Sequence, residues 1–338
     1  MKTIVLERPG AFQLTERPAP AAPAAGEALV RVRRVGVCGS DLHAYKGDQP
    51  FFTYPRVVGH ELGVEIVSIG GSDHGLAAGD RCAVEPYLNC GTCIACRRGK
   101  TNCCVRLQVL GVHTDGGMRE LITVPVAKLH KSATLTLDQL ALIEMLTIGA
   151  HAVRRAQLEP GEPVLVIGAG PIGLSVIRFA QLVGADVTVL EVSERRREFC
   201  QRHLQVGRCL DAGGDPVTRL EGMLGGDLPT TVFDATGNKQ SMVQALRYVA
   251  NGGKLVLVGL VQAEVGYPDP EMHRRELTLL RSRNATWQDF AWAIRMVEQG
   301  RIDLAPWITH RAPADAVPGE FASWLDPARG VVKAVVEF

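Results

Sequence analysis

The chain has 338 residues, enough for one large domain or two ordinary domains with well-buried cores. Apolar residues make up 46% and charged residues 22%, which is typical of a globular protein. The formal net charge of +1 offers no electrostatic basis for binding nucleic acid or an anionic membrane, so we expect neither partner.

The N-terminal segment carries Glu7, Arg8 and Pro9 where a signal peptide needs an apolar run. No apolar stretch approaches the about 20 residues of a membrane span. We therefore expect a cytoplasmic protein.

Short β-type runs punctuated by Gly, Pro and Asp fill the first 130 residues, among them "EALVRVRRVGV", "GVEIVSIG" and "DRCAVEPY". They predict a mostly-β domain with long loops. The Pro- and Ala-rich segment 17–27 is interpreted as an extended connection between two early strands. The stretch 35–47, "VGVCGSDLHAYKG", is interpreted as a glycine-rich loop away from any helix.

The chain has nine cysteines, and five of them fall between residues 90 and 104. A secreted disulfide scaffold would spread its cysteines, whereas clustered thiols in a large intracellular protein favour a metal site. The spacing Cys-x2-Cys-x2-Cys-x7-Cys is formed by Cys90, Cys93, Cys96 and Cys104. Four thiolates fit a closed, structural zinc site with no place for substrate. Cys103 is an alternative fourth ligand that the spacing leaves open.

The pattern changes near residue 138, where "LDQLALIEMLTIGAHAVRRAQL" predicts a helix that ends at "EPGE". The run "PVLVIG" then predicts a buried parallel strand, followed by the helix "PIGLSVIRFAQLVGA" and the strand "DVTVLEV". Continued alternation through "TVFDATG" and "GKLVLVGL" predicts a doubly wound parallel sheet. The closing strand "GVVKAVVEF" is expected to return to the N-terminal domain, so that one domain is inserted in the other.

A dinucleotide-binding loop is predicted between the first strand and helix of this sheet, in "VLVIGAGPIGLSV". Its Gly168-x-Gly170-x-x-Gly173 pattern permits a tight turn, and the following helix N-terminus attracts phosphate groups. Glu191, 23 residues after Gly168, is expected to bind the ribose hydroxyls and to favour NAD over NADP. Further expected cofactor contacts are Pro171, Ile172, Arg196, Thr236 and Gly259. An arginine among Arg195, Arg196 and Arg197 is the feature that would instead accept NADP.

A second metal site explains the polar residues of the first domain. Cys38 and His60 are ligand types that suit zinc, and Glu144 is an acid in an otherwise apolar segment. Two or three protein ligands with an open position are typical of a catalytic zinc, which lowers the pKa of a bound alcohol. We expect Cys38, His60 and Glu144 to hold this zinc, with Glu61 adjacent in one of three open roles: direct ligand, transient replacement of water, or a charge that acts from beyond the ligands.

The proton released by the alcohol needs a route to solvent. Ser40 and His43 supply a hydroxyl and an imidazole for this relay. Asp41 is a candidate partner for the second ring nitrogen of His60.

The motifs "CGSDLHAYKG", "GHE", "CGTCIACRRGKTNCC", "IEMLTIGAHAV" and "GAGPIG" together resemble the zinc-dependent medium-chain alcohol dehydrogenases over nearly the whole chain. The resemblance implies an α/β protein with a GroES-like catalytic domain at 1–148 and 283–338 and a Rossmann NAD-binding domain at 149–282. It also implies Cys104 as the fourth structural ligand, hydride transfer between a zinc-bound alcohol and NAD(P), and a homodimer or homotetramer.

Within this family, a glutamate at position 144 resembles the polyol and threonine dehydrogenase branch. A narrower similarity, in "GDQPFFTYPRVVGHE", "GVHTDGG" and "SRNATWQDF", is to bacterial oxidoreductases of L-galactonate-like sugar acids. Arg283 and Asn284 are the candidate contacts for a substrate carboxylate. Met145 departs from the family, which usually has proline there, so whether Glu61 or Glu144 ligates zinc directly stays open. The alternatives are a sorbitol- or threonine-type dehydrogenase and dependence on NADP.

Overall fold

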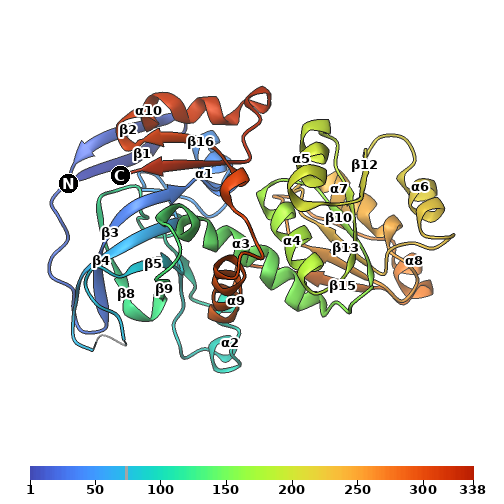
Figure 1. Cartoon of the computed structure of the whole chain (residues 1–338), viewed down its shortest axis with the longest axis horizontal. Helices are drawn as coiled ribbons and strands as arrows, with labels where there is room; N and C mark the ends of the chain where they lie inside the picture. The colour runs from blue at the N-terminus through green and yellow to red at the C-terminus, as the bar shows by residue number, and fades with distance from the viewer. Residues whose placement is uncertain (73–74) are drawn as a thin grey trace. The chain divides into compact units, whose positions relative to one another are not determined.

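The computed structural model describes residues 1–72 and 75–338. The chain forms two compact units: unit 1 comprises Met1–Met145 and Thr286–Phe338, and unit 2 comprises Leu146–Ala285. Figure 1 shows that the blue N-terminal strands and the red C-terminal strands belong to the same unit. Among the described helices, none combines the length and the apolarity that crossing a membrane requires.

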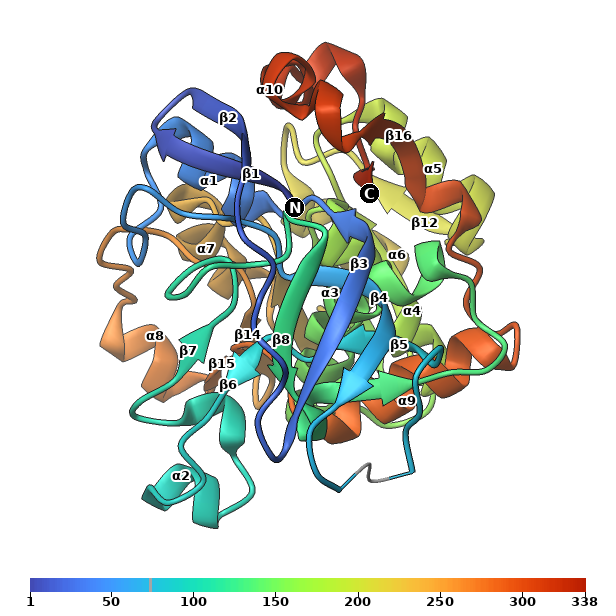
Figure 2. The ribbon, with the colours of Figure 1, turned by 90° about the vertical axis from the view of Figure 1, so that its left-hand side faces the viewer.

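Unit 1 is built on a mostly antiparallel sheet with the order β16-β17-β3-β4-β5-β9, and β8 also pairs with β3. Figure 2 shows β3 between β4 and β8. Buried and half-buried residues alternate along β3, because successive side chains of a strand point to opposite faces. The strands of unit 1 are β1 (Lys2–Arg8), β2 (Ala11–Glu16), β3 (Glu27–Gly36), β4 (Glu61–Ile69), β5 (Arg81–Val84), β6 (Tyr87–Leu88), β7 (Gln108–Val109), β8 (Leu121–Pro125), β9 (Leu129–Lys131), β16 (Ile308–Pro313) and β17 (Lys333–Glu337).

The closing strand β17 joins this sheet, as the sequence predicts. It pairs in parallel with β16 and antiparallel with β3, with Val335 opposite Gly36. The segment 17–27 connects β2 to β3, also as expected. The helices of unit 1 are α1 (Gly39–Lys46), α2 (Ile94–Arg97), α9 (Trp287–Glu298) and α10 (Val317–Glu320), together with the first part of α3 (Leu137–Ala156).

The interpretation of residues 35–47 as a loop without helix is wrong, because residues 39–46 form α1. A capping box starts this helix: the backbone N–H of Cys38 donates to Oδ2 of Asp41 at 2.9 Å, and the Cys38 side chain accepts from the N3 backbone. Gly47 ends the helix in the left-handed conformation, with φ 89°. The segment lacks apolar periodicity and uses cysteine as its cap, so it gives no ordinary helix signal.

Unit 2 is a parallel sheet with the order β12-β11-β10-β13-β14-β15. Its central strands are continuous apolar runs that are buried, as in sheets covered on both faces. The predicted doubly wound α/β fold is thus confirmed. Its strands are β10 (Pro163–Ile167), β11 (Asp186–Leu190), β12 (Arg208–Leu210), β13 (Thr231–Asp234), β14 (Lys254–Leu257) and β15 (Thr278–Arg281), and its helices are α4 (Pro171–Leu182), α5 (Glu194–Leu204), α6 (Pro216–Met223), α7 (Lys239–Ala245) and α8 (Asp269–Arg274).

Candidate active site

Cys38, His60 and Glu61 converge in unit 1, with one potential ligand atom from each lying within 4.8 Å of the others. Cys38 stands at the start of α1, and Glu61 begins β4 directly opposite Gly36 of β3. A Cβ atom at position 36 would lie 2.2 Å from Oε2 of Glu61, so only glycine leaves room for this carboxylate. Sheet pairing therefore sets the positions of residues that are far apart in the sequence.

The group has the properties of a cation site. Nδ1 of His60 and Oε2 of Glu61 are buried and lack a hydrogen-bond partner within residues 1–72 and 75–338, which is costly in a protein interior. Burial alone would lower the pKa of His60, but the neighbouring Cys38, Asp41 and Glu144 raise this pKa well above its usual value. Thiolate, imidazole and carboxylate are ligands that zinc prefers. The residues therefore fit a zinc ion.

Glu144 of α3 lies outside this three-residue group but close to it. Oε1 of Glu144 accepts a hydrogen bond from the hydroxyl of Tyr87, and both side chains are buried. Burial raises the pKa of the Glu144 carboxyl, His60 opposes the rise and Glu61 adds to it. The structure thus gives Glu144 a protein partner that the sequence does not reveal.

Lys333 of β17 is a second residue of the centre that sequence reasoning missed. Its Nζ donates to Oε1 of Glu61 at 2.7 Å and to the carbonyl of Val37 at 2.9 Å. Burial alone would lower the pKa of Lys333, but Glu61 and Cys38 raise it above its ordinary value. The only local signal is a lysine within the apolar strand "GVVKAVVEF".

The candidate relay residues both lie on α1, three residues apart. Oγ of Ser40 is buried without a hydrogen-bond partner among the described residues. His43 is exposed, and its Nδ1 lies 2.8 Å from Oδ1 of Asp48, a partner that the sequence did not suggest. Asp41 approaches Nδ1 of His60 only to 3.8 Å, which is beyond a hydrogen bond.

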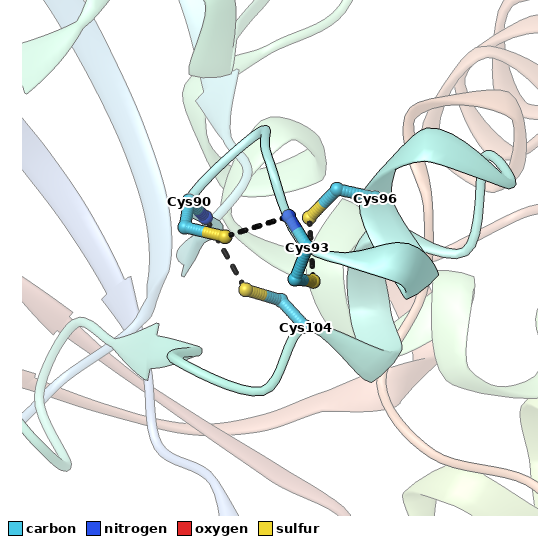
Figure 3. Close-up of side chains that lie close together, drawn as sticks. All are labelled: Cys90, Cys93, Cys96 and Cys104. Carbon is cyan, nitrogen blue, oxygen red and sulfur yellow. Dashed lines mark hydrogen bonds between the residues drawn. The ribbon is translucent and has the colours of Figure 1, made fainter.

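The four-cysteine cluster comprises Cys90, Cys93, Cys96 and Cys104, whose Sγ atoms lie within 4.8 Å of one another. Figure 3 shows the four thiols pointing toward a common centre. Backbone N–H groups donate to the sulfurs: Cys90 to Cys104 at 3.2 Å, and Cys93 to Cys90 at 3.4 Å. A hydrogen bond from Arg106, with others from Thr92 and Cys93, lowers the pKa of Cys90 to about 5. Thiolates so favoured are the form that binds zinc.

Cys104→Ser is expected to remove about one zinc ion per chain and to lower the unfolding temperature, because a structural zinc site contributes folding energy directly. Cys103→Ser is the matched control, since Cys103 is the exposed neighbour outside the cluster. Metal analysis and thermal unfolding of both variants make the test. Equal zinc loss from the two variants would contradict the assignment of Cys104.

The glycine loop of unit 2 leads from β10 into α4. Gly168 has φ 90°, and a Cβ atom at Gly173 would lie 1.8 Å from the carbonyl oxygen of Gly168. Gly170 caps α4, followed by Pro171 and Ile172 in its first turn. The backbone N–H groups at this helix start are suited to phosphate.

Of the remaining predicted cofactor residues, Glu191 and Thr236 lie against the same loop. Oε2 of Glu191 accepts from the backbone N–H of Ala169 at 2.6 Å, which places this carboxylate on the glycine loop. A Cβ atom at Gly168 would lie 3.0 Å from Cγ2 of Thr236, and one at Gly259 would lie 2.4 Å from the backbone nitrogen of Gly237. Arg196 is exposed.

Arg197 donates to the carbonyls of Glu191 and Val192 and to Asp211. It therefore braces the turn after β11. Arg283 and Asn284 lie beyond β15, near the end of unit 2. Arg283 is exposed, and Asn284 is half-buried with φ 52°.

Two family descriptions match the chain: residues 24–134 match the alcohol dehydrogenase GroES-like domain, and residues 171–299 match the zinc-binding dehydrogenase domain. The chain is 40% identical to the L-galactonate-5-dehydrogenase of Escherichia coli K12 over 338 residues, which cover 100% of this chain and 99% of that relative. The chain belongs to the zinc-binding alcohol dehydrogenase family.

This zinc-binding dehydrogenase also resembles solved structures over its full length. A crystal structure of the alcohol dehydrogenase RspB from Escherichia coli CFT073, complexed with NADH, has a TM-score of 0.91 and 30% identity, covering 100% of this chain and 99% of that one. A zinc-binding dehydrogenase of Sinorhizobium meliloti 1021 bound to NADP has a TM-score of 0.90 and 29% identity, with the same coverage. These two relatives bind different dinucleotides.

Proposed function

We propose that the chain is a zinc-dependent dehydrogenase that transfers a hydride from a secondary alcohol of a sugar acid or polyol to NAD, giving a ketone. The observation that carries the proposal is the Cys38–His60–Glu61 group, in which the buried His60 and Glu61 each have a polar atom with no hydrogen-bond partner in the described part of the chain. The similarity to L-galactonate-5-dehydrogenase supports an aldonate as substrate. A relative named L-arabinitol 4-dehydrogenase, from Hypocrea jecorina, is 30% identical over 92% of this chain and 85% of its own length, and supports a polyol.

The sequence favours Glu144 as the third zinc ligand, with Glu61 adjacent. In this proposal Cys38, His60 and Glu61 hold the catalytic zinc, supported by the convergence of these three side chains, and Glu144 lies beside them. Zinc, when bound, supplies a Lewis acid that makes a hydroxyl group more acidic. Ser40 takes part in carrying the released proton, and His43 passes it toward solvent. Residues three apart on a helix share a face, so the two side chains of α1 are suited to a relay. Asp48 holds the His43 ring in one orientation through Nδ1.

The cofactor site is proposed to comprise the loop Gly168, Gly170, Pro171, Ile172 and Gly173, with Glu191, Arg196, Thr236 and Gly259. Preference for NAD follows from Glu191, because its carboxylate accepts hydrogen bonds from ribose hydroxyls and repels a 2′-phosphate.

Glu191→Ala is expected to lower kcat/KM for NAD by about 100-fold, since hydrogen bonds to a charged group are lost. The value for NADP is expected to stay level or to rise. Glu198→Ala, which removes an exposed carboxylate of α5, serves as the control and is expected to leave the NAD value near that of the parent protein. Steady-state kinetics with both dinucleotides make the measurement. An unchanged ratio of NAD to NADP in Glu191→Ala would argue against this role.

A substrate panel tests the reaction class. The zinc-loaded protein is mixed with NAD and an aldonate such as L-galactonate, a neutral polyol such as L-arabinitol or sorbitol, or threonine, and NADH absorbance is followed. We expect the highest kcat/KM with the aldonate. A higher value with sorbitol or threonine would assign the protein to that branch instead. If none of these alcohols led to reduction of NAD, the proposal would be overturned.

Arg283 and Asn284 are proposed to contact the substrate, with Arg283 binding the carboxylate of a sugar acid. Arg283→Leu is expected to raise KM for the aldonate by about 10-fold or more, and KM for a neutral polyol far less. Equal changes for both substrates would remove Arg283 from the site.

Three further features are proposed. The domain boundaries are 1–148 with 283–338 for the catalytic domain and 149–282 for the cofactor domain. The protein is cytoplasmic, where thiols such as those of the cysteine cluster stay reduced. It forms a homodimer or homotetramer, supported by β15, the last strand in the sheet order of unit 2, which exposes Leu279. Light scattering measures the mass in solution.

A further inference from the structure

The extended segment around β6 carries three polar side chains at alternate positions: Glu85, Tyr87 and Asn89. Tyr87 lies in the strand itself (Tyr87–Leu88), and Lys128 bonds to both Glu85 and Asn89, so we call these three residues the 85–89 strip. Glu85 and Tyr87 are each only 2% exposed. A polar strip buried in this way needs partners, and each of its members has one that belongs to a different part of unit 1.

Tyr87 connects the strip to the candidate catalytic centre. Its hydroxyl donates to Oε1 of Glu144, and burial raises the pKa of Tyr87 well above its usual value, so the hydroxyl keeps its proton and remains a donor. The Tyr87 ring packs edge-on against Phe290 of α9, with ring centroids 6.4 Å apart. Glu144, the acceptor of this hydrogen bond, is held in place by α3. Both partners are thus held by packing as well as by the bond.

Glu85 and Lys128 brace the strip. Lys128 Nζ donates to Oε1 of Glu85 and, at 2.9 Å, to Oδ1 of Asn89. One ammonium group therefore joins the two outer members of the strip, with Tyr87 between them. Nε2 of His130 lies 3.2 Å from Oε2 of Glu85, and its ring stacks on Phe290 at 4.5 Å. The aromatic ring that supports Tyr87 is therefore tied to the same carboxylate.

Asn89 connects the strip to the four-cysteine cluster. Its Nδ2 donates to Sγ of Cys96 at 3.6 Å, and the next residue along the chain, Cys90, is itself a member of the cluster. The sequence of contacts runs from Cys96 through Asn89 and the backbone of β6 to Tyr87, and from there to Glu144. Only Leu88 and Asn89 lie in the chain between Tyr87, which bonds to Glu144, and Cys90 of the four-cysteine cluster.

We infer that Tyr87 is a positioning residue for Glu144, and that the 85–89 strip makes the four-cysteine site a support of the catalytic centre. This inference rests on the proposed zinc-dependent function. The Tyr87 hydroxyl fixes one oxygen of Glu144 and limits rotation of a carboxylate that lies beside the ligands His60 and Glu61. Residues beyond the ligands that orient charged groups in this way affect metal affinity and activity by about 10- to 100-fold.

Tyr87→Phe is the decisive variant, because it removes one oxygen atom and keeps the ring against Phe290. Zinc release to a chelator is followed, and the phase that belongs to the catalytic site is identified as the one missing in Cys38→Ser. We expect Tyr87→Phe to release that zinc about 10-fold faster or more and to lower kcat by a similar factor, with KM for NAD nearly unchanged. The zinc-release measurement needs no substrate, so it stands even if the substrate panel fails.

Tyr267→Phe is the matched control. It also deletes one tyrosine hydroxyl bond, to the carbonyl of Met242 at 3.0 Å in unit 2. Its catalytic zinc is expected to leave at the parent rate. If Tyr87→Phe released zinc no faster than Tyr267→Phe, and retained the parent kcat, Tyr87 would have no positioning role.

Lys128→Met tests the strip as a whole, since Lys128 bonds to Glu85 and Asn89 and to no ligand of the catalytic group. We expect the release of zinc from the catalytic site to the chelator to be severalfold faster in this variant as well. A lower unfolding temperature with an unchanged zinc phase would overturn the link between the two sites. This outcome is decisive even if Tyr87→Phe fails to fold.

Discussion

We expect Lys333→Met to lower the free energy of unfolding by about 3 kcal/mol and to weaken zinc binding at the catalytic group. Removing one member of a buried ion pair leaves the other charge uncompensated in the protein interior. Glu61 is fully buried, and Lys333 donates to it at 2.7 Å. Denaturant unfolding of the metal-free protein measures the stability, and metal analysis after zinc loading measures the binding.

Two further variants make this prediction specific. Lys333→Met combined with Glu61→Gln removes both charges, so it is expected to recover part of the stability that the single variant loses. Lys2→Met breaks an ion pair with Asp315 that is exposed to solvent, and it should leave the unfolding midpoint unchanged. If Lys333→Met and Lys2→Met had the same midpoint, the buried pair would have no special importance for the fold.

His60→Ala is expected to lower kcat/KM by at least about 1,000-fold and to remove about one zinc ion per chain, because the catalytic group loses one of its three converging ligands. The zinc of the four-cysteine cluster is expected to remain. His273→Ala is the matched control, since His273 is an exposed residue of α8 in unit 2. Retention of about two zinc ions per chain by an inactive His60→Ala would mean that His60 acts in another way.

The strand–turn–helix fold of the glycine segment, the convergence of four cysteines and the parallel sheet of unit 2 follow from patterns that are local in sequence. The glycine loop between β10 and α4 depends on a strand, a turn and a helix that follow one another directly, so its spacing carries the information. The cysteine cluster likewise falls within 15 residues, 90–104. Strand and helix alternation predicted unit 2 because buried parallel strands form continuous apolar runs.

The features that sequence reasoning missed depend on contacts between distant segments. Lys333 reaches Glu61 across 272 residues, and Tyr87 reaches Glu144 across 57. The sequence position of a single lysine or tyrosine does not identify the residue that it contacts. Only the folded arrangement of distant segments brings each residue to its partner. The helix α1 was missed for another reason: its caps, rather than apolar periodicity, define it.

The pairing of β17 with β3 has a consequence for biosynthesis. The Lys333 ammonium and the Val37 carbonyl, which bond across this pairing, are 296 residues apart. At the usual elongation rates of about 5–20 residues per second, a ribosome needs about 15–60 s to synthesise the chain between them. All the residues of unit 2 leave the ribosome within that interval. Unit 2 can therefore fold before Lys333 is synthesised, so nascent chains pass through a period in which Glu61 lacks its ion-pair partner.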